Sequence, residues 1–478
     1  MSRKYQIKLT GEFCAEAANG DLIKGADIEA VHGASIDTRT AKPGQVFIAI
    51  PGPNFDGHQF MDEAIAKGCV GLVVNNEFIS RAVAASGEAP DRVFVVAVEN
   101  TVKALGMIAN AWIHVLGPKV VAVTGSVGKT TTKELLAECM KTRYVTLATV
   151  GNLNNHIGLP LTALSLKPEH EAVVFEMGMN HAGEIAHLCK IARPQIGVVT
   201  YVGPVHLEGL GSIAAIADAK SELISALPKN GVAVLNADNP HVIAMAQRAP
   251  CPVMTFGFDA NATVRIVDAQ IDERGLLTLS LQYKDEIIPV ATFLVGLHNA
   301  ANVAAAVTAA IAAGVPFDKA CNAIGLVTPS SHRLAVIQAN HFRIIDDCYN
   351  ASPPSMAAAL QVLAQNQGRK VAILGDMLEL GAATDVAHLE LGSLVAAKKI
   401  DVLIAVGKYS DRIVLGAKDS QGFEAEVYKV DDAIQAAKIA EVVVTKGDTV
   451  LVKGSRGVGL DIVVKALESL SGREELSN

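Results

Sequence analysis

The stretch VTGSVGKTTTKELL, residues 123–136, decides how this sequence is read. It continues the apolar run KVVA and contains Gly128-Lys129-Thr130, the end of the phosphate-loop pattern G-x-x-x-x-G-K-[ST]. Val123 occupies the place of that pattern's first glycine, so the loop is shortened and its earlier glycine is Gly125. A strand that ends at Thr124, followed by a helix, still directs backbone N–H groups toward a phosphate. The stretch therefore predicts a nucleotide phosphate site.

Two side chains of this loop carry the chemistry. The Lys129 ammonium supplies a positive charge, and the Thr130 hydroxyl can ligate Mg²⁺. The alternative is a glycine-rich turn whose lysine lies on the surface, but the strand–GKT–helix context favours phosphate. The loop indicates ATP or GTP without fixing the reaction. The predicted nucleotide-binding residues of the loop are Gly125, Ser126, Val127, Gly128, Lys129, Thr130 and Thr131.

The length and composition of the chain limit the class of protein to which it can belong. A chain of 478 residues is expected to form two to four domains. Half of the residues are hydrophobic and 19% are charged, which is typical of a chain that forms folded cores. The net charge of -8 argues against a general nucleic-acid binder, because phosphate backbones require a basic face.

Two features bear on location. The first residues have no apolar core and are not a signal peptide, and the uncharged stretch 287–316 is mostly alanine. We interpret that stretch as a strand end, a turn and a buried helix from about Asn299, not as a membrane span. Seven cysteines without a CxxC pair suit a reducing cytoplasm, and all seven are expected to be core residues.

The pattern along the chain predicts three α/β domains. Residues 1–98 contain short strands separated by Gly and Pro turns. Residues 99–328 alternate apolar runs with helical patterns, which predicts a parallel sheet covered by helices, and the period-two stretch after Cys251 predicts an antiparallel excursion. Residues 329–478 repeat the strand–helix alternation, which predicts a Rossmann-like domain with ligand-binding loops at the carboxyl ends of its strands.

Three polar residues of the middle domain are catalytic candidates. Glu176 ends the run EAVVFE, where a carboxylate beside the phosphate loop would help to hold Mg²⁺; the alternative is an acid at an ordinary strand end. His206 also follows an apolar run, although a lone histidine is more often structural. Lys220 falls on the apolar face of a predicted helix, where it must be paired, deprotonated, carbamylated by CO₂ or extended to the surface. The sequence leaves these four readings of Lys220 open.

Further motifs occur along the chain in a fixed order. They are GNLNNHIGLPLTAL, FEMGMNHAGEI, GPVHLEGLGS, IADAKSELI, GLHNAANVAAA, SHRLAVI, IDDCYNASPPSM and ILGDMLELG. With the shortened loop, this ordered set resembles the Mur ligases, ATP-dependent amide-bond-forming enzymes of peptidoglycan synthesis. The resemblance runs from about Ser35 to Arg456, nearly the whole chain, and the set is highly specific although each motif alone is weak.

The resemblance implies a reaction and its cofactors. Four of the motifs are most similar to the family member that joins D-alanyl-D-alanine to UDP-N-acetylmuramoyl-tripeptide through an acyl phosphate. It implies ATP and Mg²⁺ as cofactors and those two small molecules as substrates. We expect a cytoplasmic monomer with no nucleic-acid partner and no membrane insertion.

Other readings remain open at this point. The nearest is the Mur ligase that adds the third amino acid, but its DNPR recognition motif is absent from the last domain. A folylpolyglutamate-type synthetase shares the short loop and normally lacks the N-terminal UDP-binding domain. A P-loop regulatory ATPase belongs to another class, and it has no need of His206 and Lys220 beside the loop.

The resemblance also implies roles for individual residues. A second Mg²⁺ would be held by His206 and carbamylated Lys220, in addition to the Mg²⁺ held by Thr130 and Glu176. The last domain would bring phosphate and ribose contacts to ATP, and the polar start of the helix near residue 299 would face the adenine. For Ser35, Asp37 and Arg39, the alternative to UDP contact is a turn-capping ion pair. The implied substrate-binding residues are Ser35, Asp37, Thr38, Arg39, Asn154, Asn155, Asn180 and His181, and the implied ATP contacts are Asn299, Asn302, Arg333 and Asp347.

Overall fold

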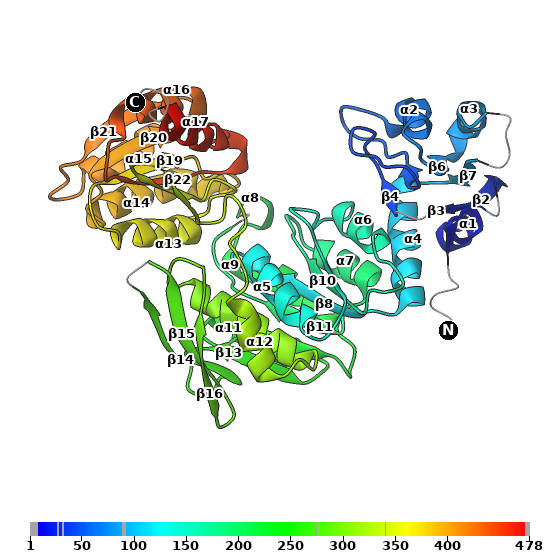
Figure 1. Ribbon diagram of the computed structural model, residues 1–478, viewed down its shortest axis with the longest axis horizontal. Helices are drawn as coiled ribbons and strands as arrows, with labels where there is room; N and C mark the ends of the chain where they lie inside the picture. The colour runs from blue at the N-terminus through cyan, green and yellow to red at the C-terminus, as the bar shows by residue number, and fades with distance from the viewer. Residues whose placement is uncertain are drawn as a thin grey trace.

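Three α/β units follow one another along the chain, each built around its own main sheet (Figure 1). The central unit, cyan to light green, lies between the blue N-terminal unit and the yellow-to-red C-terminal unit. The predicted α/β class with three domains is therefore confirmed. The structure is a computed structural model that describes residues 8–25, 28–30, 33–87, 92–205, 207–272, 275–339 and 341–473.

The N-terminal unit contains a five-stranded sheet in the order β2-β7-β6-β5-β4. Strands β4 to β7 pair in parallel, and β2 is antiparallel to β7 at one edge. A separate two-stranded ladder joins β1 to β3. The elements are β1 Leu9–Thr10, α1 Gly11–Ala18, β2 Asp21–Lys24, β3 Glu29–Ala30, β4 Ala34–Ser35, β5 Val46–Ile48, η2 Gly57–Phe60, α2 Met61–Ala66, β6 Gly71–Asn75, η3 Asn76–Phe78, α3 Ile79–Ala85 and β7 Phe94–Val98.

The central unit contains a nine-stranded sheet in the order β16-β15-β14-β13-β12-β11-β8-β10-β9. Its strands pair in parallel from β9 across to β14, and β14, β15 and β16 then pair antiparallel within the same sheet. The predicted antiparallel excursion is thus an extension of the parallel sheet. The strands are β8 Lys119–Thr124, β9 Thr146–Ala148, β10 Ala172–Glu176, β11 Ile196–Val199, β12 Val232–Asn236, β13 Val253–Gly257, β14 Val264–Ile271, β15 Leu277–Tyr283 and β16 Glu286–Ala291.

Helices cover both faces of this sheet, and successive residues of a strand alternate between two apolar clusters. In β8, Val120 and Ala122 pack with α4, α7 and α9, whereas Val121 and Val123 pack with α5, α11 and α12. This double burial explains why the strands read as continuous apolar runs. The helices are α4 Thr101–Leu116, α5 Lys129–Lys141, α6 Gly158–Leu164, α7 Glu184–Ala192, α8 Leu207–Leu210, α9 Ile213–Ser225, α10 Pro240–Ile243, η4 Ala244–Arg248, α11 Asn299–Ala312 and α12 Phe317–Ile324.

The C-terminal unit contains a six-stranded sheet in the order β17-β18-β22-β19-β20-β21. All neighbours pair in parallel except the edge strand β17, which is antiparallel to β18. This is the predicted Rossmann-like alternation. The elements are β17 Ala335–Gln338, β18 Arg343–Asp346, α13 Pro353–Ala364, β19 Lys370–Gly375, η5 Gly381–Ala383, α14 Thr384–Ala397, β20 Val402–Val406, α15 Ser410–Lys418, β21 Glu426–Val430, α16 Ala433–Val443, β22 Thr449–Lys453, η6 Arg456–Val458 and α17 Asp461–Arg473.

The N-terminal unit joins the central one through a shared apolar cluster that includes residues of α1, β7, α4, α6 and α7. Phe13 of α1 meets Trp112 of α4 edge to face, with ring centroids 5.6 Å apart. The Trp112 indole N–H donates to the Leu166 carbonyl oxygen of the central unit over 2.9 Å. A continuous core across this boundary indicates a firm joint.

The C-terminal unit meets the central one through polar contacts and through Val295, which packs in the apolar cluster of the C-terminal unit. The Glu208 N–H on α8 donates to the Glu379 carbonyl oxygen beside η5, over 3.2 Å. The Arg333 guanidinium donates to the Thr130 hydroxyl at the start of α5, over 3.1 Å. Two of these contacts are polar and are made by single residues, unlike the continuous apolar core that joins the N-terminal and central units.

The stretch that resembles a membrane span folds as interpreted: β16 ends at Ala291 and α11 begins at Asn299. Within the described ranges, none of the helices combines the length and apolar character needed to cross a bilayer. All seven cysteines are free thiols, and six of them are buried as expected. Cys251 is only half-buried, and Cys348 lies beside a histidine.

Candidate active site

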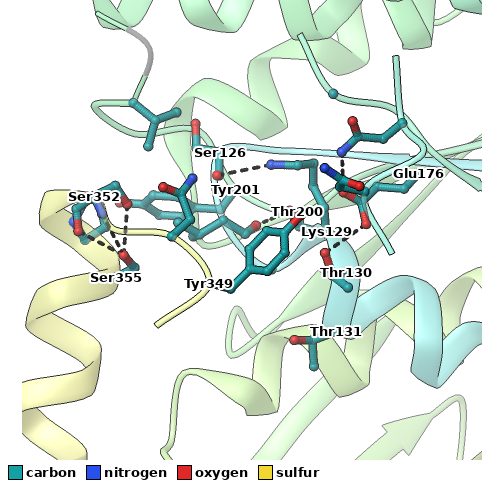
Figure 2. A pocket seen from close by; sticks show the side chains of 18 of the residues that line it. Ser126, Lys129, Thr130, Thr131, Glu176, Thr200, Tyr201, Tyr349, Ser352 and Ser355 are labelled. Atoms are coloured by element: carbon teal, nitrogen blue, oxygen red, sulfur yellow. Dashed lines mark hydrogen bonds between the residues drawn. The ribbon is translucent and has the colours of Figure 1, made fainter. Parts of the chain in front are cut away.

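A cleft of about 1530 Å³ lies between the central and C-terminal units. The central unit contributes the phosphate loop, the ends of β10 to β12 and the start of α11, and the C-terminal unit contributes the segments after β18, β19 and β22. Strands of both sheets therefore direct their carboxyl ends into one cleft, which is where open α/β sheets bind ligands. Figure 2 shows loop residues of the central unit facing Tyr349, Ser352 and Ser355 of the C-terminal unit.

The phosphate loop connects β8 to α5 as the sequence predicts. The Ser126 N–H donates to the Tyr201 carbonyl oxygen over 2.7 Å, and the Thr200 hydroxyl donates to the Val127 carbonyl oxygen over 2.6 Å. The neighbouring strand β11 thus fixes the loop in place. Ser126 to Thr131 all line the cleft. Figure 2 shows Thr131 lower on α5, away from Lys129.

Two positions of this loop require glycine, because neighbouring side chains lie too close to leave space for a Cβ atom. A Cβ added at Gly125 would lie 2.0 Å from the Thr200 hydroxyl oxygen. A Cβ added at Gly128 would lie 2.2 Å from Asn302 Oδ1, and Gly128 also has φ +83°, a conformation that side chains other than glycine rarely adopt. The shortened loop is therefore packed directly against β11 and α11.

Substitution of Gly128 by alanine is expected to weaken nucleotide binding at least about tenfold, since strained backbone and the clash with Asn302 both act on the loop. Isothermal titration with ADP measures this loss. Gly422→Ala is the matched control, because Gly422 has φ +75° with nothing near its Cβ position. Equal affinities for Gly128→Ala and the control would refute the role of the clash.

Glu176 ends β10 directly opposite Val123 of β8, so its carboxylate reaches the start of α5. The Thr130 hydroxyl donates to Glu176 Oε2 over 2.8 Å, and the Asn154 amide donates to Glu176 Oε1 over 2.8 Å. The pair of hydroxyl and carboxylate oxygens on the cleft wall is the hard donor set that Mg²⁺ prefers. The residues therefore fit the predicted Mg²⁺ site.

Positive charges gather around this carboxylate. Lys129 Nζ donates to the Gly125 carbonyl oxygen over 2.8 Å, so the side chain curls back over its own loop. Burial lowers the pKa of the Lys129 ammonium, while the charge of Glu176 raises it and that of Arg333 lowers it further. An anion bound in the cleft would relieve the repulsion between Lys129 and Arg333.

Lys220 is 1% exposed on α9, and it makes no hydrogen bond or ion pair within the described part of the chain. Burial, and then the charge of Lys129, hold the pKa of the Lys220 ammonium well below its usual value. Lys220 is thus close to the phosphate-loop lysine, and its amine is favoured in the neutral form. The extended, snorkelling alternative is excluded by this burial. His206, the predicted partner of Lys220, lies outside the described residues.

The C-terminal wall contributes an arginine and a buried ion pair. The Arg333 guanidinium carbon lies 4.0 Å from the centroid of the Tyr349 ring, which holds it flat against the wall. Lys453 Nζ lies 2.6 Å from Asp347 Oδ2 and donates to the Asn350 carbonyl oxygen over 2.9 Å. Burial raises the pKa of the Asp347 carboxyl, and the charge of Lys453 opposes that rise. Arg333 and Asp347 line the cleft as expected.

Sequence reasoning missed three residues of this site. Lys453 ends an apolar run of the sequence. Tyr349 belongs to the motif IDDCYNASPPSM, from which only Asp347 was predicted as a site residue. Thr200 is a hydroxyl residue at the end of the run IGVVT. Position at the carboxyl end of a predicted parallel strand was the signal for Thr200 and Lys453.

Asn299 and Asn302 begin α11 beside the loop and line the cleft. The Asn302 amide donates to Asn299 Oδ1 over 2.8 Å, and the Thr132 hydroxyl donates to Asn302 Oδ1 over 3.3 Å. Both asparagines are buried, so these contacts supply the partners that buried amides need.

The predicted substrate residues of the central unit divide into two groups. Asn154, Asn155 and Asn180 line the cleft, whereas His181 does not. Asn155 Oδ1 accepts from the N–H groups of Ile157 and Gly158, which caps the start of α6. Asn155 therefore has a structural role in addition to its position on the cleft wall.

The predicted substrate residues of the N-terminal unit lie at the end of β4 and in the turn that follows it, and they are not part of the cleft lining. The Asp37 carboxylate pairs with the Arg39 guanidinium at 2.6 Å, and Ser35 Oγ bonds the Asp37 backbone. Thr38 is buried, while Arg39 is 85% exposed. The turn-capping ion pair that was the alternative reading is therefore present in the structure.

The loop, the carboxylate beside it and the second wall bearing an arginine define a multidomain P-loop protein. Family models match most of the chain: Mur ligase family, catalytic domain, at 30–113; Mur ligase middle domain at 123–310; and Mur ligase, glutamate ligase domain, at 332–456. The chain belongs to the Mur ligase family, whose members are ATP-dependent ligases.

Curated relatives and solved structures agree with this assignment. The chain is 35% identical over 472 residues to the UDP-N-acetylmuramoyl-tripeptide--D-alanyl-D-alanine ligase of Bacillus subtilis, covering 96% of this chain and 98% of the relative. It is 36% identical over 466 residues to the ligase of the same name from Escherichia coli, covering 97% and 99%. Crystal structure I of MurF from Acinetobacter baumannii superposes with a TM-score of 0.84 at 29% identity, covering 97% of this chain and 99% of that one. The structure of MurF from Thermotoga maritima in complex with ADP superposes with a TM-score of 0.79 at 29% identity. The match covers 94% of this chain and 99% of that one.

Proposed function

We propose that this enzyme joins D-alanyl-D-alanine to UDP-N-acetylmuramoyl-tripeptide, with ATP as the energy source. The observation that carries the proposal is a phosphate-loop cleft in a chain that matches relatives of that name over nearly their full length. A solved structure named for the ligase of the preceding step has 18% identity and a TM-score of 0.53, which supports the shared fold alone.

The proposed reaction has three steps. A terminal carboxylate oxygen of the tripeptide attacks the γ-phosphorus of ATP, and the bond to the bridging oxygen breaks to release ADP. The free amine of D-alanyl-D-alanine then attacks the acyl phosphate carbon. The tetrahedral intermediate loses phosphate and a proton to give the amide. Two anions must meet in the first step, so the enzyme must gather positive charge around them.

ATP is proposed to occupy the cleft, with its phosphates on the loop from Gly125 to Thr131. Support comes from the geometry of that loop and from the ADP bound to the Thermotoga maritima relative. Lys129 and Arg333 would neutralise the phosphates from the two walls. Asn299 and Asn302 would face the adenine side, and Asp347 the ribose.

Mg²⁺ is proposed to lie between Thr130 and Glu176, which already share a hydrogen bond. Bound there, it would supply charge neutralisation and hold the phosphates in line for transfer. A second ion is assigned to His206 and Lys220, provided that Lys220 carries a carbamate. A neutral amine is the form that reacts with CO₂, and the lowered pKa of Lys220 favours that form.

The N-terminal unit is proposed to hold the uridine diphosphate part of the substrate through Ser35, Asp37, Thr38 and Arg39. The Arg39 side chain is mostly exposed, so it could turn toward a diphosphate once its ion pair with Asp37 opens. The substrate's peptide end would then pass Asn154, Asn155, Asn180 and His181 on its way to the cleft. We place the domain boundaries at 98/99 and 328/329, and we expect a monomer in a reducing cytoplasm, in keeping with its free cysteines.

Phosphate release from ATP tests the proposal. We expect release that requires both UDP-N-acetylmuramoyl-tripeptide and D-alanyl-D-alanine. Release with UDP-N-acetylmuramoyl-dipeptide and a free amino acid would instead assign the enzyme to the preceding step. Release without any amine acceptor would indicate a regulatory ATPase, and Lys129→Ala is the control for contaminating ATPases.

A further inference from the structure

Three side chains of different chemistry meet behind the C-terminal wall of the cleft. His332 Nδ1 lies 2.7 Å from Asp346 Oδ2 and 3.3 Å from Cys348 Sγ. The three atoms all lie within 4.8 Å of one another. Imidazole, carboxylate and thiol are all zinc ligands in proteins. The proposed ligase reaction uses none of these three residues.

The cluster is buried on one side and open on the other. Asp346 and Cys348 are each 2% exposed, whereas the His332 side chain is 31% exposed and lines the cleft. A cation could therefore reach the cluster from the cleft without unfolding the domain. In a tetrahedral site the fourth position would be taken by a water molecule.

The spacing of the donor atoms is close to that of a tetrahedral site. With metal–nitrogen and metal–oxygen bonds of about 2.0–2.1 Å and a metal–sulfur bond of about 2.3 Å, neighbouring donors lie roughly 3.3–3.6 Å apart. The distance from His332 Nδ1 to Cys348 Sγ already has this value. The hydrogen-bonded distance from Nδ1 to Asp346 Oδ2 must widen by roughly half an ångström. The Asp346 and Cys348 donor atoms lie within 4.8 Å of each other.

The backbone holds His332 over the other two residues at a conformational cost. His332 has φ +63° and Leu334 has φ +52°, both in the left-handed region that non-glycine residues seldom occupy. Asp347 Oδ1 accepts from the Leu334 N–H over 3.2 Å, and the Tyr349 N–H donates to the His332 carbonyl oxygen over 3.3 Å. These bonds fix the turn against the segment after β18, so the donor atoms are positioned in advance.

We propose that His332, Asp346 and Cys348 form a binding site for one thiophilic divalent cation of the Zn²⁺ class. Thiolate and imidazole favour Zn²⁺ and Co²⁺ over Mg²⁺, which prefers oxygen donors in octahedral geometry. On binding, the thiol proton leaves to solvent and His332 binds through Nδ1 with its proton on Nε2. The cation would tie together the two segments that carry Arg333 and Asp347.

Co²⁺ titration of the reduced full-length enzyme tests the site, in excess Mg²⁺ so that oxygen-donor sites are occupied. We expect one equivalent to bind and to produce a thiolate-to-cobalt charge-transfer band together with the strong visible bands of tetrahedral cobalt. Zn²⁺ should displace the cobalt and remove these bands. The readout is optical, so it is independent of ligase activity and of whether the proposed function is correct.

Cys348→Ser is expected to abolish the charge-transfer band and to weaken binding at least about tenfold. Cys251→Ser, which changes the half-buried cysteine elsewhere, should leave both unchanged. His332→Asn is the second variant, because asparagine tolerates positive φ and position 332 is partly exposed, so folding is preserved. Absence of the band in the wild type, its persistence in Cys348→Ser, or unchanged affinity in His332→Asn would each overturn the proposal.

Discussion

Replacing Lys220 with alanine is expected to lower kcat for ligation by about 10²–10³-fold while leaving the fold intact. The physical reason is the loss of the proposed metal-binding carbamate beside the phosphoryl group that is transferred, since removal of one such electrostatic contact has an effect of that size. Lys220 is buried without a partner in the described residues, so its replacement does not leave another buried charge unpaired. Steady-state phosphate release gives kcat, and thermal unfolding verifies the fold.

The prediction rests on the chemistry of the amine. The ammonium first loses one proton to solvent. The neutral nitrogen then attacks CO₂, a nitrogen–carbon bond forms, and a second proton leaves, so the cation becomes an anion. Only the neutral amine can attack, and the pKa of Lys220 is held well below its usual value by burial and then by Lys129. The wild-type enzyme in ¹³C-labelled bicarbonate should therefore show a carbamate resonance that Lys220→Ala lacks.

Chemical rescue separates this role from a merely structural one. A short carboxylate such as acetate or formate can occupy the space left in Lys220→Ala and restore part of the activity. Lys133→Ala is the matched control, since Lys133 is also buried but donates to the Thr149 carbonyl oxygen. Carboxylates should not rescue that variant. Full activity of Lys220→Ala without any additive, or a carbamate resonance that survives the substitution, would refute the role.

The sequence predicted those parts of the site that follow from strand order and local pattern. Glu176 could be placed beside the phosphate loop because the carboxyl ends of neighbouring parallel strands share one edge, and β10 does pair with β8. The position of Lys220 on an apolar helix face followed from residue spacing, although its burial had to be read from the structure. The three α/β units followed from the alternation of apolar runs and helical patterns.

What the sequence could not predict depends on contacts between distant segments. Arg333 donates to Thr130 across 203 positions of the chain, and Lys453 pairs with Asp347 across 106. Neither partner is marked by local pattern, because side-chain direction and domain approach decide which charges meet. The ion pair between Asp37 and Arg39 is a local contact between residues two positions apart. Such a pair can be predicted from the sequence, and it was the alternative to ligand contact there.

The buried pair of Lys453 and Asp347 leads to the second large effect. Lys453→Ala is expected to destabilise the C-terminal domain by about 3–5 kcal/mol, because it leaves a buried carboxylate without its partner. The enzyme has several domains, so global unfolding is not a two-state measure. Hydrogen exchange of the amides in β18 and β22 reports the stability of the domain that holds the pair.

The loss of stability caused by Lys453→Ala should grow as the pH rises. Burial already raises the pKa of Asp347 above its ordinary value, and without Lys453 that pKa rises further. An acid whose folded-state pKa lies above its unfolded-state pKa loses folding stability as pH rises between those two values. The difference in stability between Lys453→Ala and the wild type should therefore be largest at neutral and alkaline pH. It should become smaller as the pH is lowered toward the ordinary pKa of a carboxyl group.

Two further variants make the argument specific to this pair. The double variant Asp347→Asn with Lys453→Met removes both charges, so it should recover most of the lost stability and abolish the pH dependence of the difference. Lys465→Ala breaks the exposed pair with Asp461 on α17 and should change stability by less than about 1 kcal/mol. If Lys453→Ala were as mild as Lys465→Ala, the pair would not be holding the segment after β18 in place. The second wall of the cleft would then depend on the stacking of Arg333 on Tyr349 and on its bond to Thr130.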